Sequence, residues 1–380
     1  MSQIESPYQQ EISEQTFLDL CTWLSDDLLY SEDQLTRLLE EEHYLKLIEL
    51  ANTYWLIGHL TKQFKNKHIW QRLPQTLKVY LTTLEKVYLQ RSQAIQQEVI
   101  GVCRVLKKVT PQLVLLKGSA ALFNGVANPI CTRYMADIDI LVAQDKLELC
   151  IEALVQNSYI LDVTDSSIST KDFHHASPLI REDGPCYIEI HRRPLVNTLK
   201  NILSAEEAMN QSMPLLIGED LIVQQMHPTQ QIIHTIAHSE LQDRGYKEAH
   251  IDLRQLLNFY LIAKTFAAQI CWRTVEQRFI DTKQFYVLES IVFHANKLLG
   301  LPILIHHFEQ GKSEIQYKRC IRNFTHDKNT TTFLSSICIV LQGYSKATII
   351  NLYGENGYFP IFRGRLKHFK RHLLLLFRSS

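Results

Sequence analysis

The stretch Met135-Ala136-Asp137-Ile138-Asp139-Ile140-Leu141-Val142 decides the fold of this 380-residue chain. Acidic and apolar residues alternate along it with a period of two, which predicts a β-strand with both carboxylates on one face and the apolar residues toward a core. Asp137 and Asp139 then lie close together and repel each other unless a cation sits between them. The pattern therefore suits a divalent metal site, although an Asp-x-Asp pair alone is a weak signal.

The segment before this strand has the pattern of a strand, a tight turn and a helix. Residues 112–116 form a short apolar run, Lys117-Gly118-Ser119 follows, and small residues begin at Ala120. Glycine lets the backbone approach a ligand closely, and the start of a helix presents free N–H groups to an anion. Ser119 adds a hydroxyl, and Lys117 either meets phosphate or simply lies beside the turn. Neither Walker A nor Gly-x-Gly-x-x-Gly spacing is present. An anion-binding turn next to paired carboxylates predicts a site for a metal–nucleoside triphosphate.

A third carboxylate comes from a predicted hairpin. Residues 173–181 and 186–191 are strand candidates, and Glu182-Asp183-Gly184-Pro185 between them is typical of a turn. Alternation in the second strand places Glu189 and His191 on the face opposite its two isoleucines. If that face is shared with the aspartates, three carboxylates form a cluster that can hold two metal ions.

The order of elements predicts an α+β protein with three regions. Residues 1–105 form a helical N-terminal region, 106–200 a core with a mixed β-sheet, and 201–380 a helical C-terminal region. Apolar spacing of three and four residues predicts helices at 15–29, 31–51, 75–106, 146–157, 204–209, 228–240, 251–268, 272–282 and 287–299.

Composition narrows the classes of protein. Forty Lys and Arg balance forty Asp and Glu, so the net charge is zero, which argues against bulk duplex nucleic acid as the main partner. The eight cysteines contain no Cys-x-x-Cys pair, which excludes a zinc knuckle built on such pairs. The N-terminus is polar and acidic, without the pattern of a signal peptide, and no apolar run reaches the ~20 residues that span a bilayer. We therefore expect a cytoplasmic protein with reduced thiols and no transmembrane segment.

These motifs together resemble the DNA-polymerase-β-like nucleotidyltransferase superfamily and, more narrowly, the bacterial uncharacterised nucleotidyltransferase family. The resemblance covers roughly residues 45–260. The residues that carry it are Leu115-Leu116-Lys117-Gly118, Arg133, Asp137 to Val142, His174-His175 with Pro178-Leu179, Glu189-Ile190-His191, and His234 and His238 with Asp252-Leu253. It implies that the mixed-sheet core at 106–200 is a polymerase-β-like catalytic core.

The resemblance also implies nucleotidyl transfer with ATP or another nucleoside triphosphate as substrate. Asp137 and Asp139 would bind Mg²⁺ or Mn²⁺, and Gly118 and Ser119 would hold the β- and γ-phosphates. Glu189 would ligate a second metal ion and assist deprotonation of an acceptor hydroxyl, which attacks the α-phosphorus and expels pyrophosphate. The transferred group would be a nucleoside monophosphate, AMP in the first instance, and the acceptor a small molecule, a peptide or a protein.

Other polar residues have two interpretations each. Arg133 and Lys117 either bind the nucleotide or serve the structure, Arg133 by pinning its loop to an aspartate. Six further residues either support the site and position the acceptor or are packed and surface groups: His174, His175, His191, His234, His238 and Asp252. His234 and His238 lie one helical turn apart, but no Glu occupies the position of a His-Glu-x-x-His helix, so a packed pair is favoured over zinc chelation.

Two rival functions remain open. A phosphotransferase would use the same residues to attack the γ-phosphate and would release a nucleoside diphosphate. A catalytically silent, antitoxin-like binding module is the other, and the complete set of three carboxylates speaks against it. A tRNA acceptor is not excluded by the net charge. The basic segment 363–378 is expected to be a solvated terminal helix rather than a membrane, RNA or acidic-peptide contact.

Overall fold

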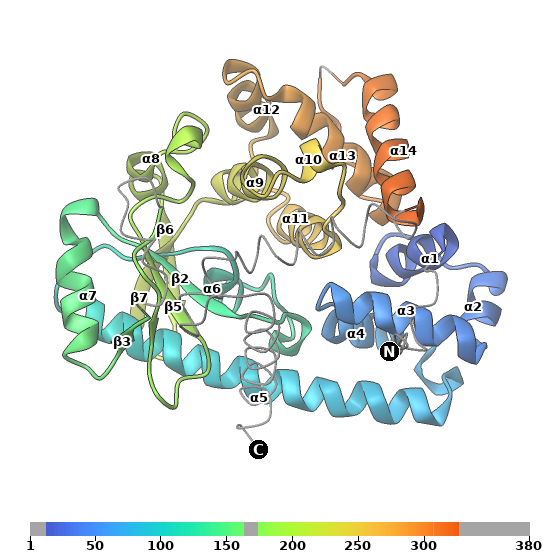
Figure 1. Ribbon diagram of the computed structural model, residues 1–380, viewed down its shortest axis with the longest axis horizontal. Helices are drawn as coiled ribbons and strands as arrows, with labels where there is room; N and C mark the ends of the chain where they lie inside the picture. Colours follow the sequence, from blue (N-terminus) through green and yellow to red (C-terminus); the bar gives the residue numbers. More distant parts are fainter. Residues whose placement is uncertain (1–12, 163–173, 307, 327–380) are drawn as a thin grey trace, which may run out of the picture.

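The computed structural model describes residues 13–162, 174–306 and 308–326, and it confirms the α+β class: a mixed sheet is flanked by helices from both ends of the chain (Figure 1). The basic segment 363–378 and the first residue of the predicted strand at 173–181 lie outside the described residues. The strands are β1 (Val114–Leu115), β2 (Asp137–Leu141), β3 (Ile160–Leu161), β4 (Leu179–Ile180), β5 (Tyr187–His191), β6 (Met213–Ile217) and β7 (Leu221–Gln225).

The seven strands run in the order β3-β4-β5-β2-β1-β7-β6. β2 pairs in parallel with β5 and antiparallel with β1, and β1 pairs in parallel with β7. The predicted hairpin is confirmed, because β4 pairs antiparallel with β5 and the Gly184 N–H donates to the Arg181 carbonyl at 2.9 Å. β1 and β4 are shorter than the sequence predicts, with two residues each.

The N-terminal region is helical, as predicted. Its elements are α1 (Glu14–Leu24), α2 (Glu32–Leu39), α3 (Glu41–Thr53), α4 (Ile57–Asn66), η1 (Trp70–Arg72) and α5 (Gln75–Leu106). The predicted helix at 31–51 is two helices, because Glu40 adopts an extended backbone between α2 and α3. α5 has the predicted bounds and starts directly after Pro74, whose fixed φ suits a helix start.

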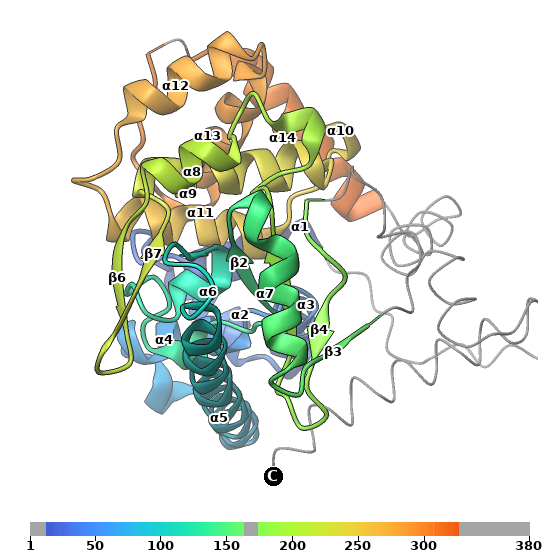
Figure 2. The same ribbon diagram turned by 90° about the vertical axis from the view of Figure 1, so that its left-hand side faces the viewer.

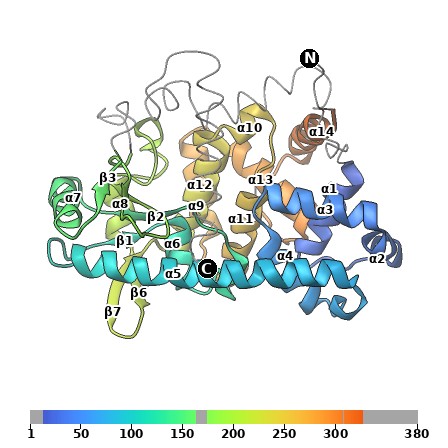
Figure 3. The same ribbon diagram turned by 60° about the horizontal axis from the view of Figure 1, so that its bottom comes forward.

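The long helix α5 connects the N-terminal helices to the sheet (Figures 1 and 3). Its first part packs against α4 and against η2 (Ile130–Thr132), and its last part packs against α7 (Leu147–Val155) and β7. Its buried residues in that last part, from Ile95 to Leu106, share one apolar core with the isoleucines of β2 and β5. The apolar face of the sheet is therefore covered, which leaves the carboxylates of the central strands on the other face.

The region after residue 200 is mostly helical but also contributes the hairpin of β6 and β7, which the sequence analysis did not predict. Figure 2 shows this hairpin at the sheet edge opposite β3 and β4. The sheet thus continues beyond residue 200. The helices are α8 (Ala205–Asn210), α9 (Pro228–Ile236), α10 (Gly245–Glu248), α11 (Leu253–Thr265), α12 (Trp272–Asp281), α13 (Phe285–Leu299) and α14 (Gln310–His326).

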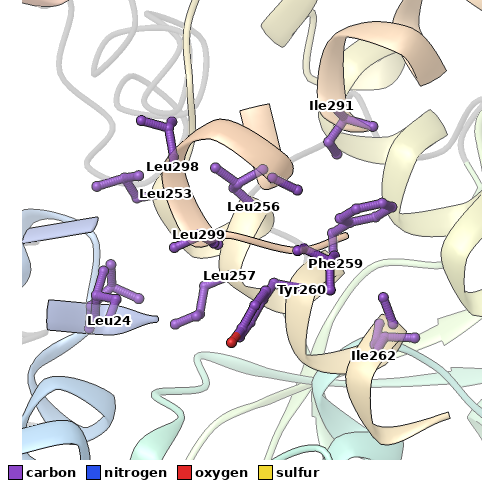
Figure 4. Close-up of a cluster of buried hydrophobic side chains, with 14 of the residues drawn as sticks. Leu24, Leu253, Leu256, Leu257, Phe259, Tyr260, Ile262, Ile291, Leu298 and Leu299 are labelled. Carbon is purple, nitrogen blue, oxygen red and sulfur yellow. The ribbon is translucent and has the colours of Figure 1, made fainter. Parts of the chain in front are cut away.

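A second apolar core joins helices from the two ends of the chain. Leu24 of α1 lies close to Leu257 and Tyr260 of α11 and Leu299 of α13 (Figure 4). These side chains are almost entirely buried. The N-terminal and C-terminal helices therefore form one packed body. None of the helices in the described ranges is long and apolar enough to cross a membrane.

A glycine in α4 marks a close helix contact and gives a first prediction. A Cβ added to Gly58 would overlap the backbone oxygen of Cys131 and lie 3.0 Å from the ring of Tyr88. We expect Gly58→Ala to lower the free energy of unfolding by about 1–3 kcal/mol in urea titrations, since the backbone must move. Gly101→Ala in α5 meets no atom within 4 Å and is the control; it should raise stability by about 0.5–1 kcal/mol. Equal stability of Gly58→Ala and wild type would contradict the close packing.

A buried carboxyl gives a prediction about pH. Glu240 lies in the π-helical turn Ala237–Gln242 that continues α9, and burial, with Asp252 and Asp243 nearby, raises its pKa to about 8. The folded protein keeps this proton between about pH 4.5 and 8 while the unfolded chain releases it, so stability falls as the pH rises through this window.

The side chain of glutamine cannot ionise, so the Glu240→Gln variant does not lose stability in this way as the pH rises. Its free energy of unfolding should exceed that of wild type by an amount that grows across the window to roughly 4 kcal/mol at about pH 8. Urea unfolding at several pH values measures it. Glu219→Gln, an exposed change of the same kind in the β6–β7 turn, is the control. A constant difference between Glu240→Gln and wild type at all pH values would refute the prediction.

Candidate active site

The central strands place the predicted carboxylates side by side. In the parallel pairing of β2 and β5, Asp139 lies opposite Glu189 and Asp137 opposite Tyr187. The isoleucines that alternate with them, at 138, 140, 188 and 190, are fully buried on the apolar face. The period-two pattern read from the sequence therefore holds on both strands.

Three side chains form a group that could hold a metal ion: Asp139, Glu189 and His191, whose ligand atoms all lie within 4.8 Å of one another. We call this group the Asp139 cluster. His191 is fully buried, and its Nε2 lies 2.8 Å from Asp139 Oδ1 and 3.4 Å from Glu189 Oε2. The sequence placed His191 only among the supporting residues, although its spacing of two from Glu189 on the same strand was a sufficient signal.

Asp137 is not part of this group, but its charge acts on it. Burial, together with the charges of Asp139 and Glu189, raises the pKa of Asp137 to about 7. Three carboxylates so close together repel one another, and a divalent cation at the Asp139 cluster would relieve that repulsion. The carboxylate oxygens of this donor set suit hard cations such as Mg²⁺ or Mn²⁺, and its imidazole nitrogen suits a transition metal.

Lys117 is the cationic partner of the cluster. Its Nζ lies 3.0 Å from Asp139 Oδ1. Burial alone would lower the pKa of Lys117, but the charges of Asp139, Asp137 and Glu189 outweigh it and raise that pKa. Burial would likewise raise the pKa of Asp139, yet Lys117 and His191 hold it well below its usual range. Lys117 is thus an internal counter-ion of the carboxylates and not a lysine directed into solvent.

The turn at Gly118 starts a short helix, α6 (Lys117–Ala121). A Cβ on Gly118 would lie 3.0 Å from the terminal carbon of Met135 and 3.1 Å from Arg133 Nε, so only glycine fits without displacing them. The Ser119 hydroxyl is fully buried and accepts the Asp139 N–H at 2.8 Å. Ser119 thus links the turn to β2. The contacts of Gly118 and Ser119 with phosphate stay predictions.

Arg133 is directed toward the C-terminal helices. Its Nη1 donates to Asn258 Oδ1 of α11 at 2.6 Å. The side chain that holds Arg133 is therefore an asparagine 125 residues away along the chain, and not the aspartate that the sequence analysis considered. The loop that carries Arg133 is fastened to α5, since Arg91 donates to the Met135 carbonyl at 2.9 Å and Ser92 to the Ile130 carbonyl at 3.1 Å.

Two histidines of the predicted strand 173–181 lie beside the cluster. His175 forms a bridge to His191, and its Nε2 is 3.8 Å from Glu189 Oε2. The rings of His174 and His175 each lie 5.2 Å from the His191 ring. Burial and the neighbouring histidines hold the pKa of His174 far below its usual range, so His174 is neutral.

The other three supporting candidates make local contacts. His234 shares a hydrogen bond of 2.8 Å with the Pro194 carbonyl, and His238 Nδ1 lies 2.9 Å from Asp243. Asp252 caps α11 by accepting the N–H groups of residues 254 and 255. The rings of His234 and His238 lie 5.8 Å apart, as a packed pair would, and His234 also lines a hollow with Lys117.

A mixed sheet that presents paired acidic residues next to a glycine turn fits the nucleotidyltransferase core that the sequence resembles. A family model described as uncharacterised nucleotidyltransferase matches residues 40–300, and the chain belongs to that family. It is accordingly a transferase of nucleotidyl groups. No curated protein matches the chain.

The pairing of Lys117 with Asp139 gives a prediction about stability. Lys117→Met keeps the length of the side chain but leaves a buried carboxylate without its ammonium partner, so we expect a loss of about 3 kcal/mol in metal-free urea unfolding at neutral pH. Arg104→Met is the control, because the Arg104–Asp220 pair is exposed and should contribute less than about 1 kcal/mol. Equal losses in the two variants would mean that Lys117 is not the counter-ion of Asp139.

Proposed function

We propose that this nucleotidyltransferase is metal-dependent and moves a nucleoside monophosphate, AMP from ATP, onto a hydroxyl of a small molecule, peptide or protein. The observation that carries the proposal is the Asp139 cluster on adjacent parallel strands, next to the glycine turn of α6. Buried carboxylates that must be balanced by Lys117 and His191 suit a site that takes a divalent cation in its working state.

Asp139, Glu189 and His191 would hold Mg²⁺ or Mn²⁺, and Asp137, whose carboxyl already feels the charges of Asp139 and Glu189, would join them when the nucleotide binds. The metal, when bound, supplies charge neutralisation for phosphate oxygens and lowers the pKa of a coordinated hydroxyl. Lys117 and Arg133 add positive charge on the side of the turn where the triphosphate is expected. Gly118 lets the Arg133 side chain lie against the turn, and Ser119 keeps β2 and the turn in register through the Asp139 N–H.

The chemical step follows from these positions. The acceptor oxygen forms a bond to the α-phosphorus while the bond from that phosphorus to the bridging oxygen of pyrophosphate breaks. The acceptor proton passes to Glu189. Burial would raise the pKa of Glu189, but the His191 hydrogen bond and the charges of His175 and His191 together lower it, so that Glu189 is ionised and can accept a proton. Positioning and electrostatic stabilisation supply the rate, without a covalent enzyme intermediate.

The test uses the full chain with Mg²⁺ or Mn²⁺, cell extract as the source of acceptors, and ATP labelled with ³²P at either the α or the γ position. We expect label from α-labelled ATP in an acceptor and release of pyrophosphate. Asp139→Asn should reduce transfer by about 10²- to 10³-fold, since it removes a charged ligand from the site. Asp145→Asn makes the same chemical change at an exposed position and should leave transfer unchanged.

The products separate the proposal from its rivals. Label transferred only from the γ position would establish a phosphotransferase and refute transfer of a monophosphate. Absence of transfer with all four nucleoside triphosphates would favour a silent binding module. Full activity of Asp139→Asn would refute the assignment of the metal site, whichever label is transferred.

A further inference from the structure

A hollow beside the candidate site brings Arg133 together with Arg254, a residue that the proposed reaction does not use. It lies between Trp55, which follows α3, the loop that carries Arg133 and Tyr134, and the face of α11 that carries Arg254 and Asn258. The centre of a water-sized molecule can occupy about 30 Å³ of it, and about 380 Å³ of space lies between its walls when the open solvent at its mouth is included. Its walls therefore come from three separate parts of the chain.

Two guanidinium groups give the hollow its charge. Arg133 and Arg254 both line it, and its lining contains no carboxylate. The Nε of Arg133 is buried and has no hydrogen-bond partner among the described residues, while Nη1 is held by Asn258. Burial and, after it, the nearby charge of Arg254 lower the pKa of Arg133 to about 10, against the opposite effect of the charges of Asp137 and Asp139.

An aromatic wall closes one side. The rings of Trp55 and Tyr134 are stacked with centroids 4.1 Å apart, and the guanidinium of Arg91 lies 5.0 Å from the Tyr134 ring. Trp55 has a φ of +59°, a conformation that is strained for a residue with a side chain, and it is 38% exposed. The fold thus holds a large apolar side chain at the mouth of a cationic hollow.

The hollow adjoins the residues around the carboxylates. A second hollow shares the wall residues Val126 and Asn258 with it, and Lys117, which lies 3.0 Å from Asp139, lines that second hollow. Arg133 Nε lies 3.1 Å from the position that a Cβ would take on Gly118. A group bound at Arg133 and Arg254 therefore lies next to the turn that carries Lys117.

We propose that Arg133 and Arg254 form a phosphate-binding subsite, in which Arg254 is a binding residue supplied by a helix outside the sheet. The buried, unpaired Nε of Arg133 and the side chain of Arg254 offer N–H donors from two directions, the arrangement that suits phosphate oxygens. The phosphate comes either from the polyphosphate tail of the nucleotide or from a phosphorylated acceptor. This inference rests on the proposed function, since it places the subsite beside a site of nucleotidyl transfer.

The test is the binding of inorganic tripolyphosphate to the full chain, measured by calorimetry in metal-depleted buffer. Arg254→Gln should weaken binding by about tenfold, as expected for the loss of a charge-assisted hydrogen bond. Arg254→Lys should recover part of the affinity. Arg273→Gln is the matched control, because Arg273 is also exposed and follows the first residue of a neighbouring helix but lies outside the hollow.

Saturating ATP distinguishes the two sources of phosphate. Displacement of tripolyphosphate would assign the subsite to the nucleotide tail, and unchanged binding would assign it to the acceptor; both support the subsite. Absence of tripolyphosphate binding, an unchanged Kd in Arg254→Gln, or an equal loss in Arg273→Gln would overturn it. Binding of an inorganic anion needs no nucleotidyl transfer. A failure of the binding experiment would therefore overturn the subsite without deciding the result of the labelling experiment.

Discussion

The parallel register of β2 and β5 is the constraint on which the candidate site depends. It sets Asp139 opposite Glu189 and Leu141 opposite His191. Because side chains alternate along a strand, a shift of one residue on either strand would turn isoleucines toward the site and carboxylates into the core beneath α5 and α7. The fully buried isoleucines of the two strands make such a shift very unfavourable, so the apolar core fixes the geometry of the acidic group.

Charge balance is the second constraint. Acidic groups buried together are tolerated only when cations and hydrogen-bond donors face them. Lys117 and His191 meet Asp139 directly, and this explains why the chain places a lysine at φ +45° before the glycine turn, a backbone conformation that only glycine adopts freely. The turn that was read from the sequence as a phosphate site is thus also the support of the carboxylates, through the buried Ser119 hydroxyl.

Local patterns predicted much of this arrangement. Alternation identified β2 and β5, and Pro74 with the apolar spacing after it gave both ends of α5. The β6–β7 hairpin was missed although Gly218 stands between two apolar runs, a known hairpin signal, because the surrounding helices favoured a helical interpretation. The hydrogen bond from Arg133 to Asn258 could not be predicted from the sequence, because it joins residues 125 apart and produces no periodic pattern.

The origin of the residues divides the site into two parts. Every member of the Asp139 cluster, and Lys117 beside it, comes from the strands and turns between residues 117 and 191. The cationic hollow instead takes walls from Trp55 and from α11, whose positions depend on the core shared by the N-terminal and C-terminal helices. Substitutions in those helices can therefore change what binds beside the carboxylates with less effect on the carboxylates themselves, because the isoleucines of β2 and β5 pack in a different apolar core and Leu141 of β2 joins the core of the helices. Chemistry and recognition are thus encoded in separate stretches of the chain, joined at Arg133.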